Sequence, residues 1–384
     1  MSGVCSIFSQ LLGVFSRAEF ERAVRQHGSE HHARGFDSWT QFIAMLFCHL
    51  GRAQSLREIC GGLAACEGKL RHLGVQQSPK RSTLAYANQH RPWQLYQTVF
   101  EQLLAKCRGE VRGGRKFRFK NKLLSLDGSV IDLSVTMYDW AKYRRTKGGV
   151  KLHLLLDHDG YLPQYAVLEP AQTAEIRIAR KLTLEPGSIV VFDRGYTDYK
   201  WFASLTRQGV FFVTRARWNT YCKVVEKRAV PEKGNILSDD MVLLGHRHYH
   251  TGVAVRRIVM LDPETGKEFT FLTNQLKFAA STIAKIYRER WQIETFFKAL
   301  KQSLRVKTFV GTSANALKTQ IWTALIAMLL LKYLKLKSTF GWSLSNLVAL
   351  LRQQLFVYRD LWAWLNAPFE PPPLIAPQQL ALPI

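Results

Sequence analysis

One short stretch, residues 188–193 (Ser-Ile-Val-Val-Phe-Asp), constrains the fold more than any other part of the chain. It is a continuous apolar run without polar alternation, which is typical of a strand buried on both faces. Further strands are predicted at 122–127, 150–156, 161–168 and 210–214, and helices at 174–181 and from 194 to about 208. This alternation of strands and helices indicates an α/β fold.

The order of these elements narrows the fold further. Three successive antiparallel strands, a helix, a strand, a helix, a strand and a later helix form the order of a ribonuclease-H-like core. In such a sheet the first and fourth strands are neighbours. Strands 122–127 and 188–193 each end in an acid, so we expect Asp127 and Asp193 to meet at adjacent strand ends.

Residues 286–301 predict one amphipathic helix, with a polar face beside an apolar one. The polar face carries Tyr287, Arg290, Glu294, Lys298 and Lys301, and the apolar face Ile286, Ile293, Phe297, Leu300 and Leu304. A single carboxylate among several cations fits a metal ligand beside phosphate-binding groups. The alternative is a solvated helix whose charges pair at i,i+4.

Asp127, Asp193 and Glu294 are the candidate catalytic acids, because three converging carboxylates cannot all ionise without a cation. Hard oxygen ligands suit Mg²⁺ or Mn²⁺. Two such ions, about 3.5–4 Å apart, activate water and stabilise the leaving oxygen in phosphodiester cleavage. The rival acids are Asp132, Asp157 and Asp198, and Asp157 has the next best claim because it also ends a predicted strand.

With these residues in place, the sequence resembles a known family, the DDE transposases of bacterial insertion sequences. The resemblance is to insertion-sequence family four, whose signature is Tyr-x2-Arg-x3-Glu-x6-Lys, and it covers about residues 120–310. The signature is matched by Tyr287, Arg290, Glu294 and Lys301, and Trp291 after the arginine also fits. The two aspartate motifs are resembled by Asp127-Gly128-Ser129 and Asp193-Arg194-Gly195-Tyr196.

The resemblance implies a mechanism and roles. Asp127, Asp193 and Glu294 would hold two Mg²⁺ ions, for which Mn²⁺ can substitute. The implied DNA and phosphate contacts are Tyr287, Arg290, Lys301, Arg194, Lys298 and Trp291. Family members free the element through a DNA hairpin, and Trp218 is the candidate aromatic residue that stacks on a flipped base, with core packing as the alternative.

The implied activity is that of a transposase. It would bind terminal inverted repeats, hydrolyse the phosphodiester at each end of the element, and join the 3′-hydroxyl to target DNA. A homodimer bridging two ends is expected. Two alternatives remain: a structure-specific nuclease on the same fold, and a catalytically inactive DNA-binding relic.

Composition agrees with a nucleic-acid partner. The 384 residues include 54 Lys+Arg against 29 Asp+Glu, a net charge of +25. Six irregularly spaced cysteines without a CxxC pair favour a reducing compartment. The longest apolar run, 321–331, is too short to span a membrane. We therefore expect a cytoplasmic, nucleoid-associated bacterial protein without a membrane anchor.

The predicted organisation has six parts. They are a helical DNA-binding domain (1–108), a basic linker (109–121), the first part of the ribonuclease-H-like core (122–214), a β insertion (215–277), the rest of the core with C-terminal helices expected to cover the sheet (278–366), and a Pro-rich tail (367–384). In the first part, Ser55 and Ser82 are predicted helix caps. The helix after Ser82 would carry Asn88, Gln89 and Arg91 as a helix-turn-helix-like DNA reader.

Three alternating histidines, His246, His248 and His250, share one face of a predicted strand. Zinc binding would need a further ligand, and only Cys222 is near in sequence. A solvated or DNA-facing strand is the favoured interpretation.

Overall fold

The computed structural model describes residues 5–370 with short gaps. The gaps are residues 32, 67, 112–115, 134–141, 145–146, 231–233, 247–248 and 303–308, and for 142–144, 147, 246 and 249–252 only the backbone is described. The chain divides into two compact units. Unit 1 comprises Met1–Leu103, Phe309–Gly311 and Asn315–Ile384, and unit 2 comprises Leu104–Thr308 and Thr312–Ala314.

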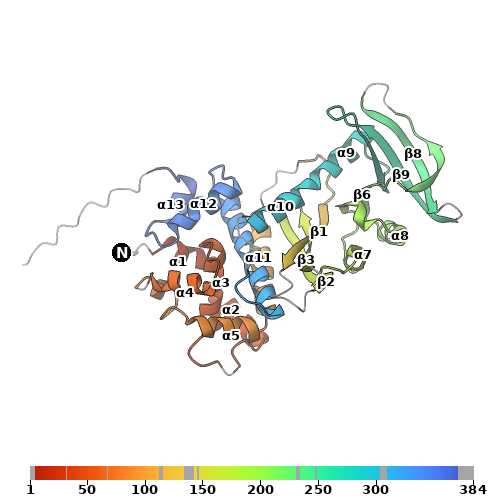
Figure 1. The fold of residues 1–384 in the computed structure, drawn as a ribbon. Helices are drawn as coiled ribbons and strands as arrows, with labels where there is room; N and C mark the ends of the chain where they lie inside the picture. The colour runs from red at the N-terminus through yellow and green to blue at the C-terminus, as the bar shows by residue number, and fades with distance from the viewer. Residues whose placement is uncertain are drawn as a thin grey trace, which may run out of the picture. The chain divides into compact units, whose positions relative to one another are not determined.

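Unit 1 is built from helices, which are coloured red, orange and blue in Figure 1. They are α1 (Ile7–Leu12), α2 (Arg17–Gln26), α3 (Ser38–Leu50), α4 (Leu56–Ala64), the 3-10 helix η1 (Leu70–Leu73), α5 (Arg81–His90), the first part of α6 (Gln94–Glu110), α11 (Ala314–Lys337), α12 (Leu344–Gln354) and α13 (Leu361–Asn366).

One of the two predicted helix caps in unit 1 is confirmed. The Ser55 hydroxyl accepts the N–H of Glu58 at the start of α4. The prediction for Ser82 is wrong, because α5 already begins at Arg81, and Lys80 occupies the N-cap position. Ser82 therefore lies inside the first turn, where it is exposed.

Two long apolar helices, α3 and α11, form the centre of unit 1. Nearly all of α3 is buried, and so is every residue of α11 from Gln320 to Leu331. Between the helices, His49 Nε2 lies 3.0 Å from the Thr323 hydroxyl, so these buried polar groups are paired. The expectation that residues 314–365 cover the sheet stays a prediction, because α11, α12 and α13 belong to unit 1 and the sheet belongs to unit 2. Their apolarity predicts burial but not the partner.

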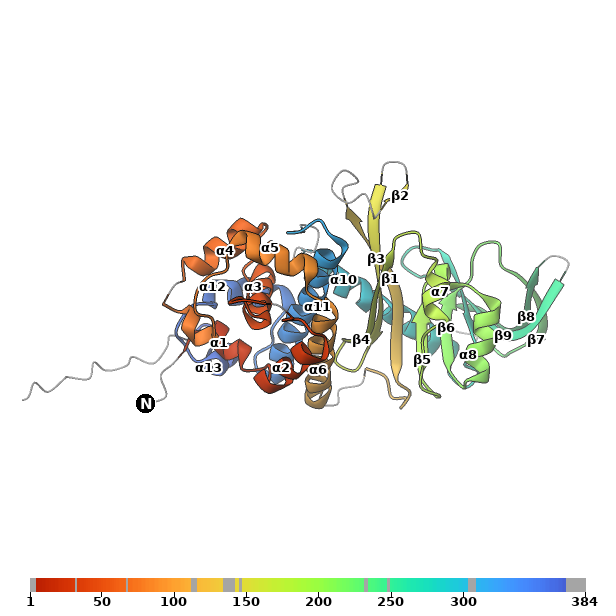
Figure 2. The same cartoon turned by 90° about the horizontal axis from the view of Figure 1, so that it is seen from below.

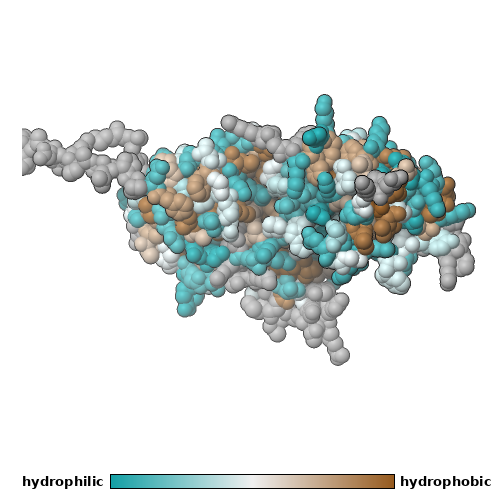
Figure 3. Space-filling model, turned by 90° about the horizontal axis from the view of Figure 1, so that it is seen from above, coloured by the Kyte–Doolittle hydropathy of each residue, from teal (hydrophilic) through white to brown (hydrophobic). Residues whose placement is uncertain are grey.

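α11 is also long and apolar enough to cross a membrane, judged by length and composition alone. However, 83% of its most apolar window is buried inside the protein, as in the core helix of a folded domain. On the face that Figure 3 shows, hydrophilic and hydrophobic residues are interspersed.

Unit 2 contains one mixed sheet in the order β2-β3-β1-β5-β6-β10-β9-β8-β7, with β4 also paired to β3. The strands are β1 (Leu123–Leu133), β2 (Lys142–Arg144), β3 (Lys147–Asp157), β4 (Leu162–Pro170), β5 (Ile189–Phe192), β6 (Phe211–Arg215), β7 (Tyr221–Lys227), β8 (Ile236–His246), β9 (Tyr249–Leu261) and β10 (Glu268–Thr273). β3 is antiparallel to β1 and β4, whereas β5 is parallel to β1 and β6. The predicted ribonuclease-H-like α/β order is confirmed, with the first and fourth predicted strands side by side.

The strands after β6 extend this sheet, because β10 pairs antiparallel with β6. A buried ion pair strengthens the extension: the Arg256 guanidinium donates to both Asp239 oxygens, at 2.8 and 2.6 Å. Arg256 also donates to the backbone oxygens of Gln275 and Phe278, which lead into the next helix. Removing one partner of such a pair typically costs about 3–5 kcal/mol, since the other charge stays buried and uncompensated.

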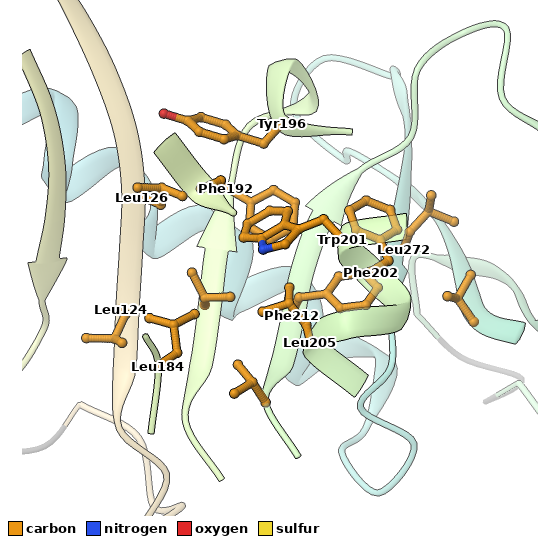
Figure 4. Packing of buried hydrophobic residues seen from close by; sticks show 14 of the residues in the cluster. Leu124, Leu126, Leu184, Phe192, Tyr196, Trp201, Phe202, Leu205, Phe212 and Leu272 are labelled. Carbon is orange, nitrogen blue, oxygen red and sulfur yellow. The ribbon is translucent and has the colours of Figure 1, made fainter. Parts of the chain in front are cut away.

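Helices cover both faces of the parallel part of the sheet (Figure 2). On one face, α7 (Glu175–Ala179) and α8 (Tyr199–Arg207) pack against aromatic side chains, and Figure 4 shows the rings of Phe192, Trp201, Phe202 and Phe212 gathered there. On the other face, α9 (Ala280–Glu289) packs against Ile189 and Val191. β5 is completely buried, as its sequence predicts.

The predicted single helix over 286–301 is wrong, because it breaks at Arg290 into α9 and α10 (Trp291–Gln302). Arg290 has φ −50° and ψ −31°, and its N–H bonds to the carbonyl of Tyr287 three residues back. This is the tighter turn of a 3-10 helix. The predicted apolar face is confirmed where it is described: Ile286, Ile293, Phe297 and Leu300 are buried, and Leu304 lies outside the described residues.

The helix predicted to start at Arg194 begins later. The Asp193 carboxylate instead caps a short 3-10 helix, η3 (Arg194–Tyr196). Asp198 then caps α8 by accepting the N–H of Trp201. Two caps in succession therefore hold the chain in turns directly after β5.

Candidate active site

Two of the predicted acids lie on neighbouring strands, at the carboxyl end of β5. Leu126 of β1 is paired with Phe192 of β5, so Asp127 and Asp193 follow at the same level of the sheet. Neighbouring strands lie about 4.8 Å apart. The prediction that the first strand ends at Asp127 is wrong, because β3 provides a pairing partner as far as Leu133. Asp127 thus projects from a continuing strand, beside the point where β5 ends.

Glycines allow other groups to approach these two acids closely. A Cβ on Gly128 would lie only 2.9 Å from Nδ1 of the buried His153. A Cβ on Gly195 would lie 2.5 Å from Glu175 Oε2 and 2.8 Å from Asp193 Oδ1. Any larger residue at either position would shift one of these ionisable side chains, so the glycines permit the arrangement of the two aspartate motifs.

Arg290, at the turn between α9 and α10, connects two of the acids. Its Nη2 atom donates to Glu294 Oε1 at 2.6 Å, and its Nη1 atom lies 3.7 Å from Asp127 Oδ2. At the other end of α10, Lys301 Nζ donates to the backbone oxygen of Val130 at 2.7 Å. α10 is therefore attached to β1 near both of its ends, which places Glu294 beside Asp127.

The electrostatics of this cluster show a shortage of positive charge. Burial raises the pKa of Asp127 to about 6; Gly128 N–H and Arg290 oppose the rise, and the carboxylates of Asp193 and Glu175 add to it. Burial alone would lower the pKa of Arg290, but Tyr287, Glu294 and Asp127 raise it above its usual value. A further cation would relieve the repulsion between the acids.

The donor set fits a hard divalent cation, because it consists of carboxylate oxygens. Within the described residues, no three His, Cys, Asp or Glu side chains stand close enough together to hold a metal ion. Arg290 supplies the counter-charge for Asp127 and Glu294 in this arrangement. In chemistry the residues thus fit a divalent ion, and an ion bound to both Asp127 and Glu294 would displace the Arg290 guanidinium that now contacts them.

The other predicted residues of the signature surround this cluster. Tyr287 is half-buried, with its ring 5.3 Å from that of Phe271 and 5.6 Å from the Arg290 guanidinium carbon. Arg194 and Lys298 are exposed, and Trp291 is 63% exposed. Their side chains face solvent, where DNA can reach them.

Trp218 is 94% exposed, so the alternative that it packs in the core is wrong. It lies in the connection between β6 and β7, next to Arg217. The Arg217 guanidinium donates to the backbone oxygens of Arg194 and Gly195, at 3.0 and 3.4 Å. The connection that carries Trp218 is therefore attached to the turn that follows Asp193.

The three rival acids are accounted for elsewhere. Asp157 is paired with Leu124 in the β1–β3 register, at the start of β1 and three residues before Asp127, and Lys122 Nζ lies 3.5 Å from its Oδ2. Asp198 caps α8 and accepts from Arg180 at 2.6 Å. Asp132 is exposed.

Sequence reasoning missed two neighbours of the aspartates, Glu175 and the hydroxyl of Tyr196. Glu175 begins a five-residue helix and does not follow a strand, so no positional signal singles it out. Tyr196 was noted only as part of the second aspartate motif. Its pKa is raised by burial first, and then by the carboxylates of Glu175, Asp127 and Asp193.

In unit 1, two of the residues proposed to read DNA have structural roles. Asn88 is buried and its Oδ1 accepts from Gln41 at 2.9 Å. Arg91 donates to Gln41 and to the backbone oxygen of Phe36. The prediction is wrong for Asn88, because the small helical core buries it, whereas Arg91 is half-buried with its guanidinium held by these partners. Gln89 is exposed. His248 lies outside the described residues, as do the side chains of His246 and His250.

Comparison with known proteins agrees with this architecture. A family model described as a transposase DDE domain matches residues 118–330, and a model described as a domain of unknown function matches residues 5–76. A Sinorhizobium fredii protein named as transposase y4zB is 30% identical over 326 residues, which are 83% of this chain and 88% of that protein. A Geobacillus stearothermophilus protein named as a transposase for insertion sequence element IS5377 is 27% identical over 255 residues, 66% of this chain and 67% of that protein.

Among solved structures, the cryo-EM structure of the piggyBac transposase synaptic complex with hairpin DNA aligns with a TM-score of 0.46 at 9% identity. The alignment covers 92% of this chain and 80% of that chain, but the similarity is too weak to carry an argument. The DDE match spans more than half of the chain, and the first relative is similar over most of both proteins. The chain therefore belongs to the DDE transposases of insertion sequences.

Proposed function

We propose that this transposase cleaves the ends of its element by two-metal phosphodiester hydrolysis and joins the freed 3′-hydroxyl to target DNA. Asp127, Asp193 and Glu294 would hold the ions, Mg²⁺ or in its place Mn²⁺. Bound there, the ions would activate the attacking water and stabilise the leaving oxygen. The localisation that follows is the bacterial cytoplasm, at the nucleoid.

One observation carries the proposal: acids from β1 and α10 contact the same guanidinium, beside an acid at the end of β5. Nη1 and Nη2 of Arg290 lie 3.7 and 2.6 Å from Asp127 and Glu294. Residues far apart in the sequence are thus held at one place by the sheet register and by α10. Positive charge is needed there, and a divalent ion supplies more of it than one arginine.

Arg290 has two tasks in this scheme. In the free protein it neutralises Asp127 and Glu294. When DNA binds, a backbone phosphate offers the guanidinium a second partner with suitable bidentate geometry. Transfer of Arg290 to the phosphate would release the acids for metal binding, so the site would bind the ions more tightly when DNA is present.

The remaining signature residues would position the DNA end. Tyr287, Lys301, Arg194, Lys298 and Trp291 surround the cluster, and the net charge of +25 supplies long-range attraction to phosphates. Unit 1 would read the terminal inverted repeats. Its exposed Lys80, Arg81 and Gln89 replace the buried Asn88 and the half-buried Arg91 as candidates for this role. A homodimer would hold the two ends together.

Trp218 would stack on a base flipped from the end during hairpin formation. Its exposure and its attachment to the turn after Asp193 support this role. Trp218→Ala should slow the hairpin step about tenfold or more, since stacking on an aromatic ring is worth about 1–3 kcal/mol per base. Trp218→Phe should retain most of the rate. Phe369→Ala, which removes an exposed aromatic ring outside α5, is the control.

The proposal is tested by incubating an end-containing duplex and a target plasmid with the protein and Mg²⁺. Wild type should nick the end and join it to the plasmid, whereas Glu294→Gln should do neither. Asp132→Asn, an exposed acid on the same strand as Asp127, should keep both activities. Equal cleavage by wild type and Glu294→Gln would contradict the catalytic role of Glu294.

The same assay separates the competing functions. Nicking without joining would favour a structure-specific nuclease. Binding of the duplex without any nicking, in every divalent metal tried, would favour an inactive DNA-binding relic.

A further inference from the structure

A fourth carboxylate lies beside the two aspartates of the proposed active site. Glu175 Oε2 and Asp193 Oδ1 lie 2.5 and 2.8 Å from the point where a Cβ on Gly195 would stand. The two oxygens are therefore no farther apart than the sum of these distances. Because Gly195 has no side chain, the two carboxylates approach each other over its backbone.

The hydroxyl of Tyr196 is directed to the same region. Figure 4 shows its oxygen pointing away from Phe192 and toward β1, the strand that carries Asp127. Tyr196 is completely buried, and its hydroxyl has no hydrogen-bond partner among the described residues. Its ring is held in an aromatic cluster, with ring centroids 6.1 Å from Phe192 and 6.5 Å from Trp201. A buried unpaired hydroxyl costs about 1–3 kcal/mol, which indicates a partner that joins the site.

An ion pair explains only part of the position of Glu175. Lys151 Nζ lies 3.3 Å from Glu175 Oε1, with both side chains largely shielded from solvent. The other oxygen, Oε2, instead faces Asp193, which carries the same charge. Two carboxylates placed in this way repel each other unless a cation lies near both. The pairing with Lys151 therefore holds Glu175 in place without explaining its approach to Asp193.

We propose that Glu175 is a fourth carboxylate of the metal site and that, together with the Tyr196 hydroxyl, it orients the waters that a divalent ion brings to Asp193. Mg²⁺ keeps several of its waters when it binds to proteins, and the O–H groups of these waters can donate to the Glu175 carboxylate and to the Tyr196 hydroxyl oxygen. Both are positioning residues. The inference rests on the proposed function, because it presupposes an ion at Asp193.

The test is an Mn²⁺ titration of the full chain at pH 8, followed by electron paramagnetic resonance of the free ion. Glu175→Gln, which keeps the shape and removes the charge, should weaken Mn²⁺ binding about 10–100-fold, as loss of an outer-shell partner does. Tyr196→Phe keeps the ring packing and should weaken binding up to about tenfold. Glu185→Gln, an exposed acid elsewhere in unit 2, should leave binding unchanged.

Lys151→Met separates this role from a purely structural ion pair. It removes the cation that competes for Glu175, so Mn²⁺ binding should be unchanged or tighter. If Lys151→Met and Glu175→Gln weakened binding equally, the pair would be structural and the inference would be overturned. If Glu175→Gln failed to fold, Tyr196→Phe would decide, and binding equal to wild type would overturn the inference.

Two further variants distinguish the possible failures. Asp127→Asn and Asp193→Asn should both lose Mn²⁺ binding. If they kept it, the proposed function itself would be wrong. If they lost it while Glu175→Gln bound Mn²⁺ like wild type, only the role of Glu175 would be refuted.

Discussion

The two ends of the strands around β1 both carry acids, but the charges are balanced at only one of them. At the end with Asp127 and Asp193, two further carboxylates, Glu175 and Glu294, also gather, and the cations in contact are Arg290 and Lys151. At the opposite end, a hollow of about 740 Å³ is lined by three acids and three cations. These are Asp157, Asp159, Glu185, Arg108, Lys120 and Lys122.

The pairing geometry repeats this difference. Lys122 Nζ lies 3.5 Å from Asp157 and 3.6 Å from Glu185, so one lysine serves two acids, and Asp157 Oδ1 also accepts the N–H of Asp159. At the other end, Arg290 serves Asp127 and Glu294 while Asp193 and Glu175 crowd together. An aspartate at a strand end therefore gains its function from its neighbours. Where acids and cations balance, the ion pairs stabilise a loop. Where acids are in excess, the repulsion between them favours the binding of a cation.

Neutralising one acid at each end tests whether the two ends have different roles, and it should give the largest effect. Asp193→Asn should lower Mg²⁺-dependent cleavage about 10³-fold, because each metal contact supplies several kcal/mol of transition-state stabilisation. Asp157→Asn should leave cleavage within about threefold of wild type once folding is matched, since it acts only on the stability of a loop. Rates are measured on a labelled end duplex, with circular dichroism as the folding control. Similar losses in both variants would refute the division of roles.

Stability against pH provides the second test, in EDTA. The folded-state pKa of Asp127 is about 6, above its ordinary value of 3.8. Asp127 therefore loses its proton at a lower pH in the unfolded chain than in the folded protein. As a result, the free energy of unfolding falls as the pH rises from about 4 to about 6. Above pH 6 the folded protein bears the full cost of the buried Asp127 charge, about 2–3 kcal/mol at 1.36 kcal/mol for each pKa unit. Asp127→Asn should therefore raise the free energy of unfolding by about that amount at pH 8, and by little at pH 3.5.

Urea denaturation of wild type and Asp127→Asn at the two pH values measures this effect. Asp132→Asn, on the same strand but exposed, should change stability at neither pH. A gain of equal size at both pH values would show that side-chain packing, and not charge, is responsible.

The cations at the two ends give the third test, with a smaller expected effect. Arg290→Gln should tighten Mg²⁺ binding in the absence of DNA about tenfold, or 1.4 kcal/mol, because the ion no longer competes with a guanidinium. Lys122→Met should destabilise the fold by about 1–3 kcal/mol and leave the Mg²⁺ response unchanged. Thermal melting with and without Mg²⁺ measures both. If Mg²⁺ raised the melting temperature of Lys122→Met more than that of Arg290→Gln, the metal site would lie at the Asp157 end and not at the Asp127 end.

The sequence predicted the parts of the structure that depend on local pattern. The apolar run of β5 predicted a buried strand, and the order of strands and helices predicted that β1 and β5 are neighbours. The apolar face of the signature helix was also predicted correctly. These features follow from side-chain periodicity and chain connectivity, which are properties of the sequence itself.

Features that depend on tertiary partners were not predictable in this way. β1 continues past Asp127 because β3 pairs with it, and α11 is buried in unit 1 although its sequence shows only that it must be buried. Arg290 breaks the signature helix with a tight turn that places its guanidinium between two acids. Glu175 reaches the site from a short helix, and only the absence of a side chain at Gly195 makes room for it.

The most direct test of the central claim is a crystal structure of the protein with an end duplex and Mn²⁺, recorded with anomalous diffraction. We expect anomalous peaks about 2.0–2.2 Å from carboxylate oxygens of Asp127, Asp193 and Glu294, with Arg290 moved onto a phosphate. Peaks at Asp157 and Glu185 instead, or a DNA-bound site in which Arg290 still bridges Asp127 and Glu294 without any ion, would contradict it.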